Sequence, residues 1–71
     1  MPTNFLLSAY VSGKLITKRW VGWYEAKRAK KHLESVGARV VIQWLDLDCV
    51  LVDVTDASTN PEDAPALRTT Q

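Results

Sequence analysis

The sequence has few of the residue types that carry most protein chemistry. Its 71 residues include one cysteine, Cys49, and one histidine, His32, and nothing in their spacing brings the two together. A disulfide within the chain is therefore excluded, and the Cys and His ligands available for a zinc site are too few. The three glycines stand apart at positions 13, 22 and 37, which excludes a glycine-rich phosphate-binding loop. We predict a protein that is not an enzyme and that needs no cofactor or metal.

Long apolar segments are also missing. No stretch approaches the ~20 residues that a membrane-spanning helix needs. Residues 1–4 bring no basic residue ahead of the apolar residues 5–7, unlike the start of a signal peptide. We expect a cytoplasmic protein, in the host cytoplasm if the source is a virus, with no membrane partner. A chain of this length forms one domain, and a hydrophobic content of 46% suffices for a globular core.

Alternating apolar residues predict four strands, over residues 5–11, 14–21, 39–45 and 49–55. The pair Ser12-Gly13 predicts a two-residue turn between the first two strands, because glycine accepts a positive φ. In the second strand, apolar residues occur at both odd and even positions, so the sequence does not determine which face of this strand points inward. A bulge near Lys18 and Arg19 would reconcile the two parities.

A helix is predicted over residues 23–36. Gly22 is its predicted N-cap, and Gly37 is the glycine that ends it. Its apolar stripe recurs at helical spacing and consists of Trp23, Ala26, Ala29, Leu33 and Val36. The order is therefore β-β-α-β-β, an α+β fold with a four-stranded, mainly antiparallel sheet and one amphipathic helix packed on one face. We place this single domain at residues 1–56 and interpret residues 57–71, which are polar, acidic and proline-containing, as a flexible tail.

The net charge of +1 conceals a strong asymmetry along the chain. Eight basic and two acidic residues lie between positions 1 and 44, whereas one basic and six acidic residues lie between positions 45 and 71. Such a split indicates an interaction surface. The basic residues of the predicted helix and the preceding hairpin are candidates for contact with an anionic partner such as nucleic acid: Lys14, Lys18, Arg19, Lys27, Arg28, Lys30 and Lys31. A solvated helix face explains the same residues without a partner.

Tryptophan is the other unusual feature, with three in 71 residues. A core this small does not readily hold all three. One helix covers only one face of the sheet, so the other face is exposed unless a partner protein or a second copy covers it. We predict a protein interface from five residues: Leu6, Tyr10, Trp20, Trp44 and Leu51. The alternative is that all three tryptophans belong to the core or its rim.

The stretch from Gly13 to Gly37, with Lys18-Arg19-Trp20 ahead of a basic helix, resembles the small DNA-binding modules at the N-termini of phage integrases. That resemblance implies nucleic-acid binding, and the two strands predicted after the helix depart from it. In size and make-up the chain is also similar to small phage or plasmid accessory proteins, including inhibitors of host defence.

Together these observations predict a small non-enzymatic interaction protein. It would be accessory or inhibitory, would act by protein-protein contact, and could form a homodimer. The alternative is a nucleic-acid-binding module that uses the basic helix face.

Overall fold

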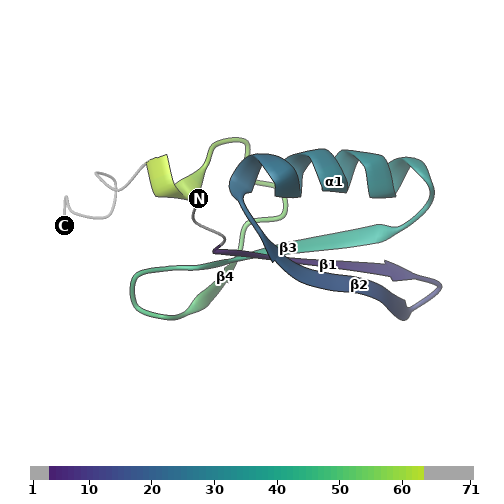
Figure 1. Ribbon diagram of the computed structural model, residues 1–71, viewed down its shortest axis with the longest axis horizontal. Helices are drawn as coiled ribbons and strands as arrows, with labels where there is room; N and C mark the ends of the chain where they lie inside the picture. The colour runs from purple at the N-terminus through teal and green to yellow at the C-terminus, as the bar shows by residue number, and fades with distance from the viewer. Residues whose placement is uncertain (1–3, 64–71) are drawn as a thin grey trace.

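Four antiparallel strands and one helix follow one another in the predicted order, which confirms the α+β fold (Figure 1). The computed structural model describes residues 4–63. Its elements are β1 (Phe5–Val11), β2 (Lys14–Val21), α1 (Trp23–Ser35), β3 (Arg39–Leu45), β4 (Leu51–Asp53) and a 3₁₀ turn, η1 (Pro61–Asp63). The strand order across the sheet is β2-β1-β3-β4, so β2 and β4 are the edge strands. No helix among the described residues is long and apolar enough to cross a membrane.

The β1–β2 hairpin closes through the predicted two-residue turn. Ser12 and Gly13 both have positive φ angles, of 53° and 79°, as a type I′ turn requires. The bulge is not at Lys18–Arg19, where the sequence placed it. Ala9 pairs with Thr17 and Tyr10 pairs with Leu15, so Ile16 is the extra residue. The inserted residue shifts the in-out alternation of β2 at Ile16. Apolar residues at both odd and even positions of β2 can therefore be accommodated.

Helix α1 begins and ends where the glycines indicate. Gly22 is the N-cap, in an extended conformation. Gly37 has a φ of +91°. The Gly37 N–H donates to the carbonyl oxygen of Glu34 at 3.1 Å, and the Ala38 N–H donates to the carbonyl oxygen of Leu33 at 3.0 Å. This pair of bonds is a Schellman motif, which satisfies carbonyls that the helix end leaves unpaired. The apolar stripe ends earlier than predicted, because Val36 is 65% exposed.

The core lies between α1 and the sheet. Trp23 and Trp44 are both buried, at 7% and 8% exposure, whereas Trp20 is 48% exposed. The rings of Phe5 and Trp23 are 5.4 Å apart between centroids, which ties the start of α1 to β1. The core cluster consists of Phe5, Leu7, Ala9, Val21, Trp23, Ala26, Ala38, Val40, Ile42, Trp44 and Val54. Two tryptophans thus fill the small core and the third remains at the surface.

Strand β4 has three residues, shorter than the predicted strand over 49–55. Before the N-terminal end of β4, the Asp46 carboxylate accepts from the backbone N–H groups of Asp48 and Val50, at 2.8 and 3.1 Å, and stabilises a turn there. After the C-terminal end of β4, the hydroxyl of Thr55 accepts from the Ile42 N–H at 2.9 Å, in place of a backbone carbonyl. One backbone bond remains beyond each end of β4, from the Asp46 N–H to the Val50 carbonyl at 3.1 Å and from the Val54 N–H to the Ile42 carbonyl at 2.9 Å. Side-chain oxygens accept from the other N–H groups there.

The segment after β4 returns to the helix side of the sheet (Figure 1). Ala57 packs against the core, and the Lys27 ammonium donates to the Ala57 carbonyl at 2.8 Å. The Asn4 side-chain amide donates to the Glu62 carboxylate at 3.0 Å. These contacts attach residues 57–62 of the predicted tail to the body. Residues 64–71 of that tail lie outside the described residues.

Candidate functional site

The sheet face opposite α1, called here the open sheet face, carries apolar side chains that no described segment covers (Figure 1). The pairing register and strand alternation place these residues on it: Leu6, Ser8 and Tyr10 of β1; Leu15, Lys18 and Trp20 of β2; Arg39, Val41, Gln43 and Leu45 of β3; Leu51 and Asp53 of β4. Leu15, Trp20 and Leu51 are 47%, 48% and 43% exposed. Leu6 is 7% exposed on this same face, because the side chains of both neighbouring strands flank it. The face has a filled centre and an exposed apolar rim.

Four of the five predicted interface residues share this face: Leu6, Tyr10, Trp20 and Leu51. Trp44 does not. It pairs with Phe5 and faces the helix, as a buried member of the core. The sequence identified the alternation within each strand but not which parity of β3 meets α1. Leu15 was not among the predicted residues, because the bulge at Ile16 that fixes its face gives no sequence signal.

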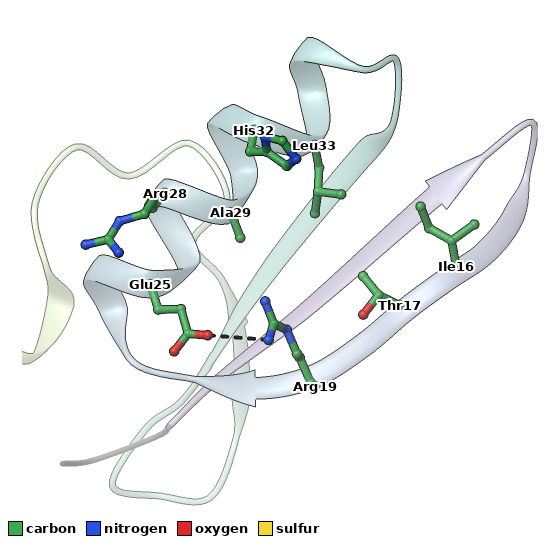
Figure 2. Close-up of a pocket in the computed structure, with 8 residues that line it drawn as sticks. All are labelled: Ile16, Thr17, Arg19, Glu25, Arg28, Ala29, His32 and Leu33. Carbon is green, nitrogen blue, oxygen red and sulfur yellow. Dashed lines mark ion pairs between the residues drawn. The ribbon is translucent and has the colours of Figure 1, made fainter.

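A groove of about 540 Å³ separates α1 from β2 (Figure 2). It exists because α1 packs over β1 and β3, which leaves the helix side of β2 uncovered. Ile16, Ala29 and Leu33 supply its apolar surface. Its polar lining residues are Thr17, Arg19, Glu25, Arg28 and His32. Figure 2 shows the Ile16 side chain directed toward this groove from β2, so the bulge supplies one of its walls.

The seven basic residues predicted to contact an anionic partner do not form one patch. Lys27 bonds to Ala57 and lies over the Trp23 ring, at 5.2 Å from the centroid, and Lys30 pairs with Glu34 at 3.2 Å. Arg19 lines the groove and forms an ion pair with Glu25 at 3.4 Å.

The remaining four lie on three parts of the surface. Lys18 is on the open sheet face, Lys14 is at the hairpin tip, and Arg28 and Lys31 are exposed on α1. Arg28 also lines the same groove as Arg19. The nucleic-acid interface stays a prediction, and Arg28 and Lys31 are its residues on α1 that have no ion pair among the described residues.

Three acidic residues of the second half, Asp46, Asp48 and Asp53, lie in the β3–β4 hairpin. The pKa of Asp53 is lowered from its ordinary value, first by the hydrogen bond from the Thr55 N–H and then by that from the Thr55 hydroxyl. Asp53 is thus a fixed negative charge at the β4 edge of the open sheet face. Within residues 4–63, no three His, Cys, Asp or Glu side chains come together as metal ligands.

Comparison with known proteins gives no further guide to the site. No protein-family model, curated protein sequence or solved structure matches the chain significantly. The open sheet face and the groove between α1 and β2 are therefore interpreted from their own residues.

Proposed function

We propose that this chain is a non-enzymatic protein-interaction protein that docks through its open sheet face. The observation that supports the proposal is the set of exposed apolar side chains on that face, with Trp20 and Leu15 on β2 and Leu51 on β4. Partly exposed tryptophan and leucine beside a filled centre are typical of the anchor residues of protein interfaces. The accessory or inhibitory role stays a prediction.

The occupant that the charges on the face favour is a second copy of the chain. Lys18 lies toward the β2 edge of the face and Asp53 on β4, so opposite charges occupy opposite edges. A two-fold axis parallel to the strands places β2 of one copy over β4 of the other. Asp53 is then level with the partner's Trp20 and about 7 Å along the strand from the partner's Lys18, whose long side chain reaches toward it. The same axis places Arg39 over the ring of the partner's Tyr10, because Tyr10 and Arg39 are register partners on adjacent central strands.

The size of the face limits the strength of this dimer. Strands of seven, eight, seven and three residues, spaced ~4.8 Å apart with a rise of ~3.3 Å per residue, give a face of about 400 Å² in projection. Two such faces packed together bury on the order of 1,000 Å², near the lower limit for a specific interface. We therefore expect a dissociation constant on the order of micromolar.

Sedimentation velocity over a concentration series tests the proposal. The unmodified chain should change from monomer to dimer with rising concentration, and Trp20→Ser and Leu51→Lys should each hold it as a monomer. Tyr24→Ser and Leu47→Ser are the matched controls, since both residues are more exposed than Trp20 yet lie outside the face. A monomer at every concentration, or controls that weaken the dimer equally, would overturn the proposal.

A charge reversal tests the axis. Lys18→Glu should weaken the dimer by about tenfold, because it turns an attraction into a repulsion. Lys14→Glu, on the same strand but at the hairpin tip, should change it little. Equal effects of the two reversals would contradict the proposed two-fold arrangement.

A further inference from the structure

Strand β2 has a free edge. It is the outer strand of the sheet, and no other strand in residues 4–63 pairs with its second side. Seven of its eight residues are not buried, and Val21 alone is. An edge strand of this kind presents unpaired N–H and C=O groups to a partner backbone. The register is continuous from Thr17 to Val21, so five residues offer regular pairing.

Both sides of this edge offer apolar contacts. On the helix side, the groove presents Ile16 and Leu33 (Figure 2). On the open sheet face, the edge is flanked by Leu15 and Trp20. An added strand directs successive side chains to opposite faces, so its alternate residues would reach these two surfaces in turn.

The charges beside the edge are mainly positive. Strand β2 contains Lys14, Lys18 and Arg19 and no acidic residue. Across the groove, α1 adds Arg28, which has no ion pair among the described residues. Glu25 is the only acidic residue among the described residues that line the groove. Its pair with Arg19 is weak because both side chains are more than half exposed. A second β2 strand would set these cations against each other, which disfavours self-pairing along this edge.

We propose that the free edge of β2, with the groove beside it, binds an extended segment of another protein in which apolar and acidic residues alternate. Backbone hydrogen bonds to residues 17–21 supply affinity. The segment's acidic side chains point into the groove, where they pair with Arg19 and Arg28. Its apolar side chains point to the opposite face of the sheet, where they contact Trp20. This inference rests on the proposed protein-binding function but uses the backbone edge of β2 and the groove, which share only Leu15 and Trp20 with the open sheet face.

The probe is a synthetic peptide, acetyl-Glu-Val-Glu-Ile-Glu-Val-Glu-amide. Amide chemical shifts and hydrogen exchange of the full chain are followed during its titration. We expect shifts and slowed exchange confined to residues 16–21 and to the groove side of α1. The peptide with proline at its centre should bind at least about tenfold more weakly, because proline removes a donor and does not fit a central pairing position. The peptide with lysine in place of glutamate should not bind.

Variants of the chain locate the site. Arg28→Glu and Ile16→Glu should each weaken peptide binding by about tenfold. Lys31→Glu is the matched control: it reverses the same charge on the same helix, but its residue does not line the groove. Leu51→Lys, which should abolish the dimer, should leave peptide binding unchanged, so failure of one proposal is distinguishable from failure of the other.

Four results would each overturn the inference. The first is no shift at residues 17–21 up to millimolar peptide. The second is a proline peptide that binds as tightly as the original peptide. The third is an equal loss of peptide binding in Arg28→Glu and in Lys31→Glu. The fourth is a β2 edge already protected from exchange without peptide, in proportion to protein concentration, which would mean that a second copy occupies it.

Discussion

The hydroxyl of Thr55 completes the hydrogen bonding of the central strand β3, and its removal should destabilise the fold. It accepts from the N–H of Ile42 at 2.9 Å and donates to the Asp53 carboxylate at 2.7 Å. Ile42 is fully buried, so water cannot readily replace the lost acceptor. Thr55→Val keeps the shape of the side chain and removes the hydroxyl, whereas Thr55→Ser keeps the hydroxyl and removes a methyl group.

The expected cost of Thr55→Val follows from the amide that it leaves unpaired. A buried backbone donor without a partner costs about 1–3 kcal/mol, so we expect a loss of about 2 kcal/mol in the free energy of unfolding. For a chain of this size, that loss lowers the unfolding temperature by about 8–16 °C. It lowers the urea midpoint by about 2 M, at an m-value of about 1 kcal/mol/M.

Urea unfolding followed by circular dichroism measures the loss, at a protein concentration low enough to keep the chain monomeric. Hydrogen exchange supplies a second readout, since the amide proton of Ile42 should exchange faster in Thr55→Val and not in Thr55→Ser. If the two variants have the same midpoint, the hydroxyl contributes nothing measurable and the reasoning fails. Unchanged exchange at Ile42 would contradict it independently.

Three further predictions concern local features. Gly13→Ala should cost about 1 kcal/mol in thermal unfolding, because its φ is +79°, whereas Ser12→Asn should raise stability, because asparagine tolerates the positive φ there. The NMR-titrated pKa of Asp53 should lie below its ordinary value and rise in Thr55→Val. Since folding lowers this pKa, its contribution to stability is present above the unfolded-state pKa and is lost as the pH falls through the folded-state pKa. If the nucleic-acid alternative holds, a labelled DNA duplex should bind at low salt, and Ala in place of Arg28 and Lys31 should reduce the salt slope by about two; no binding at low salt refutes it.

The parts of the fold that the sequence predicts are those with local signals. The hairpin is visible because Ser12-Gly13 separates two alternating segments, and the helix because two glycines bracket a regular stripe. β4 was predicted too long because residues 49–55 are apolar on both parities, which leaves no periodicity to mark its ends. Its real limits come from the Asp46 carboxylate and the Thr55 hydroxyl, which compete with the ladder for backbone groups.

The functional surfaces were predicted less completely, because they depend on which elements lie beside each other. Strand alternation indicated Leu6, Tyr10, Trp20 and Leu51, but only the packing of α1 on β3 shows that Trp44 faces inward. The groove arises from the position of α1 relative to β2 and from the bulge at Ile16. Neither of these has a signature in the sequence.

The charge asymmetry along the chain becomes an asymmetry across the sheet. Seven of the eight basic residues between positions 1 and 44 lie on β2 and α1, and Asp46, Asp48 and Asp53 lie in the hairpin of β3 and β4. One edge strand is therefore basic, and the other is next to Asp46 and Asp53. Two copies could join these unlike edges, yet each joined pair would leave a β4 edge and a β2 edge free, and the assembly would not close. Because β4 offers only three residues, such a contact has little backbone pairing to stabilise it. A longer acidic strand from another protein satisfies both the charge and the length of the β2 edge, which is why the two surfaces are assigned to different partners.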